Sequence, residues 1–221
     1  MCSNWFFSRA LQQVFLAGLL LFTAGFGARA QAMNPSTTVL PTSVVTAQKQ
    51  VHSLLMNSGA GDAPFIIVDA SDQRLYLFER NQLKLNFPVS TSAVGVGSAE
   101  GSNRTPLGLH RIAEKFGDGE PIGMIFKARR PTGQLADIQT KPIKGDGDDV
   151  TTRIMWLQGL QPGINEGKGV DSHARYIYIH GTPEEGLIGR PESHGCIRMN
   201  NTQVIELFNQ VPVGTLVDIV K

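Results

Sequence analysis

A succession of short segments rich in β-branched and aromatic residues, beginning at Phe65, most constrains the fold of this 221-residue chain. The first three segments, FIIVD, RLYLFE and KLNFPVS, are separated by the turn formers Ser71-Asp72 and Arg80-Asn81, a pattern typical of a β-meander. Five further segments of the same kind follow: LHRIAEK (109–115), RIMWLQ (153–158), RYIYIH (175–180), CIRM (196–199) and LVDIV (216–220). We therefore predict a mainly β domain, a sandwich or barrel.

Two other segments show helical spacing. In residues 43–58, apolar or small side chains recur every three or four positions: Val44, Ala47, Val51, Leu54 and Ser58. The second segment begins at Asn201, which can cap a helix, and ends at Pro212. Its apolar face is formed by Val204, Leu207, Phe208 and Val211. The predicted domain is thus mainly β with one or two helices.

Residues 1–30 have the features of a secretory signal peptide. A polar start with Arg9 precedes an apolar run at 14–26, and Ala28-Arg29-Ala30 gives the small-x-small pattern of a cleavage site. The run is shorter than the roughly 20 apolar residues that span a membrane comfortably. We therefore predict export to the periplasm or cell envelope after cleavage. An uncleaved signal would anchor the same domain on the same side of the membrane.

Cleavage would leave a tether with a possible helix at residues 31–63, followed by the main domain at residues 64–221. It would remove two arginines and Cys2, so that 18 basic residues remain against 19 acidic ones. This balance gives no indication of binding to nucleic acid or to an anionic membrane surface. With Cys196 as the one remaining cysteine, no internal disulfide can form, and the thiol needs another explanation.

Cys196 lies in a pattern that suits acyl transfer. In RYIYIH, alternation puts Tyr176, Tyr178 and His180 on one face, and the strand ends where His180 meets Gly181. The loop that follows is rich in glycine and proline, so we expect it to return Cys196 to the neighbourhood of His180. An imidazole that takes the thiol proton produces the nucleophilic thiolate. Amide N–H groups near Gly195 could then hold a developing oxyanion, because glycine permits close approach.

These residues resemble a known signature. His180-Gly181, a dozen intervening residues and Ser193-His194-Gly195-Cys196-Ile197-Arg198 are similar to the motif of the L,D-transpeptidase catalytic domain, also called the YkuD or ErfK/YbiS-type domain. The meander from Phe65, the segment STSAVG and Thr105-Pro106-Leu107-Gly108 resemble the same family. The resemblance covers about residues 64–220.

The resemblance implies an exported cysteine enzyme that acts on peptidoglycan without a cofactor or metal. Cys196 would attack the carbonyl of the third stem residue, a diamino acid such as meso-diaminopimelate, and expel terminal D-alanine. The thioester acyl-enzyme would pass to an amine acceptor: a second stem peptide, a protein lysine or a free D-amino acid. His180 matches the general base and the Gly181 carbonyl its orienting partner, while the amides of His194, Gly195 and Cys196 would supply the oxyanion donors.

Other roles stay open at this point. Ser193 can support the turn by hydrogen bonding, and the side chain of His194 can take part in chemistry or only position the loop. Arg198 can bind a stem-peptide carboxylate through its planar fork or brace the loop. Water as acceptor would make the enzyme an L,D-carboxypeptidase. Outside this class, His180, His194 and Cys196 could ligate zinc, or the domain could bind the cell wall without catalysis.

The segment from Lys115 to Asp149 carries six glycines, three prolines and the basic residues Lys127, Arg129 and Arg130, with little strand pattern. Long ordered loops are often lids or binding loops. We expect this segment and the loop at 181–192 to line one groove with Cys196 on its floor. The alternative is a solvated excursion that binds nothing.

Overall fold

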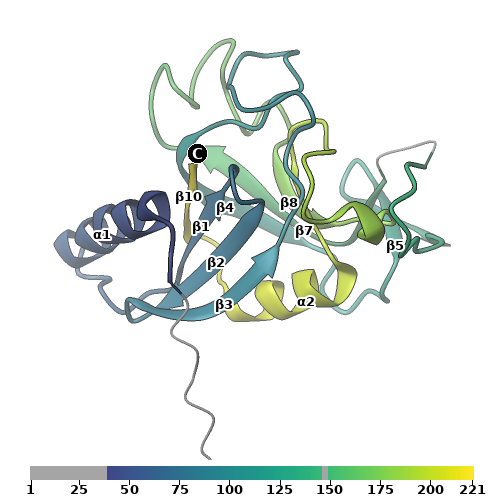
Figure 1. Ribbon diagram of the computed structural model, residues 1–221, viewed down its shortest axis with the longest axis horizontal. Coiled ribbons are helices and arrows are strands. Elements are labelled where there is room, and N and C mark those ends of the chain that lie inside the picture. Colours follow the sequence, from purple (N-terminus) through teal and green to yellow (C-terminus); the bar gives the residue numbers. More distant parts are fainter. Residues whose placement is uncertain (1–38, 146–148) are drawn as a thin grey trace, which may run out of the picture. The chain divides into compact units, whose positions relative to one another are not determined.

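The computed structural model describes residues 39–145 and 149–221. The predicted signal peptide and the first part of the predicted tether lie outside the described residues. Within them, the chain is mostly β sheet with two α-helices, which confirms the predicted fold class (Figure 1). Neither helix of the described part is long and apolar enough to cross a membrane.

The described strands form one hydrogen-bonded sheet in the order β3-β2-β1-β10-β4-β7-β5-β6, and β8 joins β7 to β9. The β1–β10 and β8–β9 pairs are parallel, and the other pairs are antiparallel. The strand bounds are β1 (Phe65–Asp69), β2 (Arg74–Glu79), β3 (Gln82–Pro88), β4 (Gly108–Phe116), β5 (Met124–Lys127), β6 (Arg130–Leu135), β7 (Val150–Gly159), β8 (Tyr178–Gly181), β9 (Ile197–Met199) and β10 (Leu216–Val220).

The strand predictions differ from the structure in two places. The strand expected at 175–180 begins only at Tyr178, because Tyr176 has a positive φ of 57° and cannot continue a strand. The segment expected to lack strands contains the β5–β6 hairpin, whose turn residues Ala128 and Arg129 both have positive φ. Such a two-residue turn normally carries Asn or Gly, so no residue type marks this turn in the sequence.

The main core lies inside the curved sheet. Ile66 and Val68 of β1 point into it, as do Ile179 of β8 and Ile197 of β9, so strands from both ends of the sheet share one cluster. Helix α2 (Asn201–Gln210) closes this core with Val204, Leu207 and Phe208. Ile179 and Ile197, packed in this core, therefore hold β8 and β9 in place.

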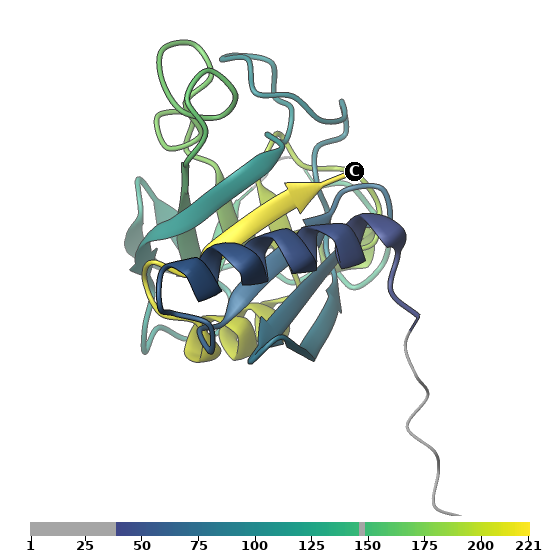
Figure 2. The same ribbon diagram turned by 90° about the vertical axis from the view of Figure 1, so that its left-hand side faces the viewer.

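Helix α1 (Thr42–Asn57) packs on the other face of β1 and β10 (Figure 2). Its buried residues are Val44, Ala47, Val51 and Leu55. The prediction of Leu54 as part of the buried stripe is wrong: Leu54 is 47% exposed, and Leu55 takes its place. A step of four residues from Val51 follows the direction of the stripe better than a step of three.

The predicted cap of α2 is wrong by one residue. The side chain of Asn200, not Asn201, accepts the backbone N–H groups of Thr202 and Gln203. Asn201 is instead buried in the protein, 1% exposed. Either asparagine satisfies the composition rule for an N-cap, and only the tertiary structure decides between them.

Candidate active site

Cys196 and His180 lie on two adjacent parallel strands. Ile179 of β8 pairs with Ile197 of β9, so Cys196, one residue before β9, lies beside Tyr178. The backbone N–H of Tyr178 lies 3.4 Å from Cys196 Sγ, and Sγ lies 3.4 Å from the carbonyl oxygen of Tyr176. Cys196 packs with Tyr178 outside the main core, and alternation along β8 gives His180 the same side as Tyr178. The fold therefore brings the two residues of the motif to one side of the sheet.

The imidazole of His180 is held in one orientation. Its side chain is 1% exposed, and its Nδ1 lies 2.7 Å from the carbonyl oxygen of Gly181. A carbonyl can only accept, so Nδ1 carries the proton and Nε2 keeps the lone pair. This is the tautomer that a general base needs, and the Gly181 carbonyl has the position expected of the orienting partner.

The space around Gly181 admits no side chain. A Cβ there would lie 2.5 Å from Asn201 Oδ1 and 2.8 Å from the carbonyl oxygen of Thr151. The Asn201 amide in turn accepts from the Thr151 hydroxyl at 2.7 Å and donates to the carbonyl of Thr182 and to Glu185 Oε1, each at 2.7 Å. This buried polar network could not be predicted from the sequence, because its members come from β7, the loop after β8, and α2. It fixes the backbone that orients His180.

The turn before Cys196 is fixed by Ser193. Its buried hydroxyl donates to the carbonyl of Cys196 at 2.6 Å and accepts from the N–H of Gly195 at 3.2 Å. Gly195 has a φ of +125°, which favours glycine, and its carbonyl accepts from the Thr105 hydroxyl at 3.0 Å. The Gly195 N–H therefore already has an acceptor in this geometry, which weakens the case for Gly195 as an oxyanion donor and supports the turn-forming role of Ser193.

The guanidinium of Arg198 lies inside the protein. Its side chain is 1% exposed, and Nη1 forms an ion pair with Glu184 Oε2 at 2.7 Å, whose side chain is 4% exposed. The pair ties β9 to the loop that follows β8. This placement favours the bracing role over the binding of a stem-peptide carboxylate. Glu184 was not singled out from the sequence, because a glutamate in a polar loop is normally solvated.

The other histidines occupy three different environments. His194 of the motif is exposed. His173 stacks on Trp156, with ring centroids 3.8 Å apart, and its Nε2 lies 3.6 Å from a carboxylate oxygen of Glu114. His110 is fully buried between the carbonyl of Gly108 and the hydroxyl of Ser172, and burial lowers its pKa to about 4. His110 is therefore neutral and structural.

The sequence model of the YkuD family, described as the L,D-transpeptidase catalytic domain, matches residues 63–219. The chain belongs to the L,D-transpeptidase catalytic domain family. The match covers the β-rich domain, with β8, β9 and the motif between them, and leaves α1 outside.

Two named relatives carry the same family term. The putative L,D-transpeptidase YqjB of Bacillus subtilis is 48% identical over 114 residues, which are 50% of this chain and 57% of that protein. The probable L,D-transpeptidase ErfK/SrfK of Salmonella typhimurium is 27% identical over 158 residues, 70% of this chain and 43% of that protein. The chain thus spans about half the length of these relatives. A crystal structure of L,D-transpeptidase 3 from Mycobacterium tuberculosis is 14% identical, with a TM-score of 0.47 over 73% of this chain and 62% of that one.

An aromatic cluster borders Cys196 in this L,D-transpeptidase domain. Arg129, from the turn of the β5–β6 hairpin, lies over the ring of Trp156, 4.3 Å from its centroid, and donates to the Tyr178 hydroxyl at 3.2 Å. Tyr176 also stacks on Trp156, with ring centroids 5.6 Å apart, and Arg129 lies 5.5 Å from the centroid of the Tyr176 ring. The sequence indicated Arg129 only as part of a basic cluster, because the hairpin that aims it carries no turn signal. The hairpin therefore places a cation on the aromatic cluster.

The middle segment lies next to the loop at 181–192, as expected. The N–H of Gln139 donates to the carbonyl of Pro183 at 2.7 Å, and the N–H of Gly186 donates to the carbonyl of Gln139 at 2.9 Å. Lys144 and Glu192 add an ion pair at 3.6 Å. Phe126 of β5 packs in the same cluster as Cys196. Both segments thus contact each other on the Cys196 side of the L,D-transpeptidase domain, and a groove between them with Cys196 on its floor stays a prediction.

The zinc alternative finds no donor set in residues 39–145 and 149–221. No three His, Cys, Asp or Glu side chains in these ranges are grouped so that they could hold a metal ion.

Proposed function

We propose that this protein is an exported, cysteine-dependent L,D-transpeptidase of peptidoglycan. The observation that carries the proposal is the pairing of β8 with β9, which sets Cys196 and an imidazole of defined tautomer on one side of the sheet. Family membership supports the same reaction class. The donor is a tetrapeptide stem, cleaved between its diamino acid and terminal D-alanine, and the compartment is the periplasm or cell envelope.

The chemistry runs through two balanced steps. His180 Nε2 takes the proton of Cys196, and the thiolate attacks the carbonyl carbon of the diamino acid. Collapse of the tetrahedral intermediate breaks the C–N bond, and D-alanine leaves with the proton from His180. An acceptor amine then attacks the thioester, gives its proton to His180 and breaks the C–S bond, which regenerates the thiol. With water as acceptor the same acyl-enzyme yields a carboxypeptidase product.

The test is mass spectrometry of products formed from a purified disaccharide-tetrapeptide. We expect release of D-alanine, together with a species of the mass of a 3→3 cross-linked dimer. Cys196→Ala should abolish both while the near-UV spectrum of the folded protein is kept, because Cys196 lies at a loop end. D-alanine release without any amine adduct would identify the carboxypeptidase instead. D-alanine release by Cys196→Ala above a few per cent of the wild-type rate would exclude Cys196 as the nucleophile.

A second measurement addresses His180. Alkylation of Cys196 should shift to higher pH in His180→Ala, because removal of an imidazolium partner makes the thiolate harder to form. His194→Ala should shift the profile less. The two titrations are coupled, so each profile describes the pair rather than one residue. Equal shifts in the two variants would contradict the choice of His180 as the base.

A further inference from the structure

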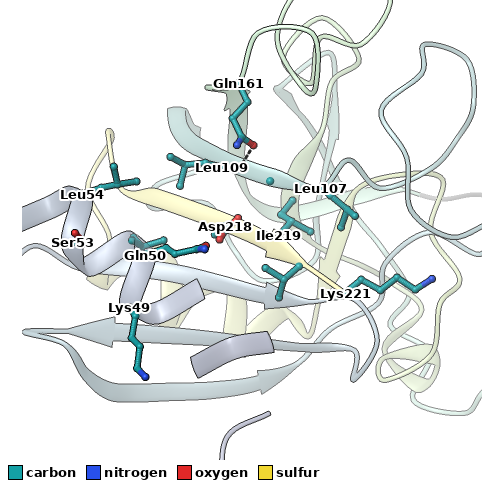
Figure 3. Close-up of a pocket in the computed structure, with 13 residues that line it drawn as sticks. Lys49, Gln50, Ser53, Leu54, Leu107, Leu109, Gln161, Asp218, Ile219 and Lys221 are labelled. Atoms are coloured by element: carbon teal, nitrogen blue, oxygen red, sulfur yellow. Dashed lines mark hydrogen bonds between the residues drawn. The ribbon is translucent and has the colours of Figure 1, made fainter. Parts of the chain in front are cut away.

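A groove of about 840 Å³ lies along α1, on the face of the sheet that the main core does not use (Figure 3). Helix α1 forms one wall, and the start of β4 with the end of β10 forms the other. The residues of these walls are Lys49, Gln50, Val51, Ser53 and Leu54 from α1, Leu107, Gly108 and Leu109 near β4, Gln161 from the loop after β7, and Asp218, Ile219, Val220 and Lys221 at β10. None of them belongs to the site around Cys196.

Asp218 lies on the floor of this groove. Val217 and Ile219 point into the main core, so alternation turns Asp218 toward α1, between Leu216 and Val220. Its side chain faces the groove in Figure 3, and the residue is only 8% exposed. No hydrogen bond or ion pair joins its carboxylate to another residue of the described ranges. Burial of a carboxyl group without a partner is costly, so the groove favours a ligand that supplies one.

The rest of the groove indicates which partner fits. Leu54 stands 47% exposed on α1, and Leu109 faces it from the sheet, so apolar side chains stand above Asp218, while the amide of Gln50 extends toward it from α1 (Figure 3). Lys49 and Lys221 are exposed at the rim, and both side chains extend away from Asp218 (Figure 3). The groove thus has negative charge at its floor, apolar walls and positive charge at its rim.

We propose that this groove binds an amino acid or peptide whose alkyl side chain ends in a primary ammonium group. The ammonium donates to the Asp218 carboxylate, the strongest kind of hydrogen bond available to it. The alkyl chain lies along Leu54 and Leu109, as the stems of lysine side chains lie along apolar surfaces. A carboxylate of the ligand points to the rim, toward Lys49 or Lys221.

A metal ion fits this groove less well than an ammonium group. Hard cations such as Ca²⁺ need six or more oxygen ligands, and Asp218 supplies the one carboxylate side chain among the residues that line the groove. The described residues contain no grouped set of acidic and histidine ligands here or elsewhere. The pKa of Asp218 is raised by burial, and a bound ammonium would oppose that shift by favouring the charged carboxylate.

The groove also has a place in the proposed function. Stem peptides carry diamino acids with free ammonium and carboxylate groups, so the groove would hold a stem that is not reacting at Cys196. This use rests on the proposed function, whereas the ammonium site itself does not. Thr105, which donates to the Gly195 carbonyl, stands two residues before Leu107 of the groove, so one short segment contacts both places.

The experiment titrates the ¹⁵N-labelled full chain with Nα-acetyl-lysine, followed by NMR. The matched ligand is Nα-acetyl-norleucine, which has the carboxylate and alkyl chain but no ammonium. We expect saturable shifts of the amides around residues 49–54, 107–109 and 216–220 with the lysine ligand. Affinity for the norleucine ligand should be weaker by about tenfold or more, because a hydrogen bond between charged groups is lost.

Variants separate this site from the catalytic one. Asp218→Asn keeps the shape of the side chain and should weaken binding of Nα-acetyl-lysine about tenfold or more. Asp118→Asn, an exposed carboxylate beyond the far end of β4, should leave it unchanged. Cys196→Ala should bind like the wild type, whatever its turnover.

The proposal fails if Asp218→Asn or the norleucine ligand binds as well as the matched partner. It also fails if the shifts appear only around Cys196, which would place the ligand in the catalytic site. Failure of the proposed function would give a different result. The wild type would then release no D-alanine, but it would still bind Nα-acetyl-lysine in the groove, and Asp218→Asn would still weaken that binding.

Discussion

Two buried charged side chains, Arg198 and Asp218, lie on opposite sides of the sheet and are accommodated differently. On the side of the catalytic motif, Arg198 is 1% exposed and pairs with Glu184 at 2.7 Å. On the side of α1, Asp218 is 8% exposed and has no such partner among the described residues. The first charge is satisfied by the fold itself and serves to fix a loop. Burial of the second charge without a partner costs folding free energy, and a ligand that donates to the Asp218 carboxylate would reduce this cost.

The difference shows how burial should be interpreted. Arg198 belongs to the motif by sequence, and its ion pair with Glu184 ties β9 to the loop that follows β8. Asp218 lies in an ordinary strand segment, LVDIV, but its isolation makes it a candidate ligand site. Whether a buried charge supports structure or binding therefore depends on its partner, which no linear motif encodes.

The largest effect is expected from Glu184→Gln. Loss of this carboxylate leaves the buried Arg198 guanidinium without its counter-charge, which typically costs about 3–5 kcal/mol of unfolding free energy. Urea unfolding measures the change. Turnover should fall as well, because the pair ties β9 to the loop that follows His180.

An exposed ion pair provides the control. Glu79 and Lys84 lie 3.5 Å apart with side chains that are about half exposed. Glu79→Gln should cost no more than about 0.5 kcal/mol, because solvent screens such pairs. Similar costs for Glu184→Gln and Glu79→Gln would show that the Arg198–Glu184 pair does not hold the loop.

His110 tests burial without a counter-charge. Burial lowers its pKa to about 4, below the unfolded value of about 6.5, so the unfolded chain binds the proton first as the pH falls. This contribution is fully present above pH 6.5 and is lost between pH 6.5 and 4, by about 3 kcal/mol at most. Urea unfolding at pH 7 and pH 4.5 measures the loss.

His110→Gln should reduce the difference between the two pH values, since it removes the titrating ring. His52→Gln, on the partly exposed surface of α1, should keep the wild-type difference. An unchanged pH difference in His110→Gln would mean that other groups cause the acid destabilisation.

Two neighbouring asparagines distinguish the buried network from an ordinary cap. Asn201→Ala leaves the Thr151 hydroxyl and the Thr182 carbonyl without their partner and should cost about 2–3 kcal/mol in urea unfolding. Asn200→Ala removes the N-cap of α2 and should cost about 1 kcal/mol. A larger effect at Asn200 would contradict the assignment of the cap and the network.

The smallest effect has the opposite sign. The pKa of Asp218 is raised by burial, so its contribution to stability is present at low pH and is lost as the pH rises through the folded value. Asp218→Asn should therefore stabilise the ligand-free protein at pH 7, by roughly 0.5–2 kcal/mol, and change little at pH 3. Destabilisation by this variant at pH 7 would mean that Asp218 has a structural partner after all.

The strand pattern could be read from the sequence because it is local. The β-branched and aromatic residues of FIIVD and RLYLFE, the turn formers between the meander strands and the helical spacing at 43–58 are each set within a few residues. The motif from Ser193 to Arg198 was equally local, and with His180-Gly181 it was enough to indicate a thiol and an imidazole that work together.

The tertiary structure decided everything that depends on groups distant in the chain. The network at Gly181 joins Thr151, Thr182, Glu185 and Asn201, and the pair Arg198–Glu184 joins a strand to a loop. Arg129 reaches the aromatic cluster through a hairpin with no turn signal, and Asp218 became a groove floor only because α1 packs beside β10. Hydrogen bonds and burial of polar groups depend on distances between residues that are far apart in the chain. The partners of these residues are therefore set only in the folded protein, where the chain has brought them together.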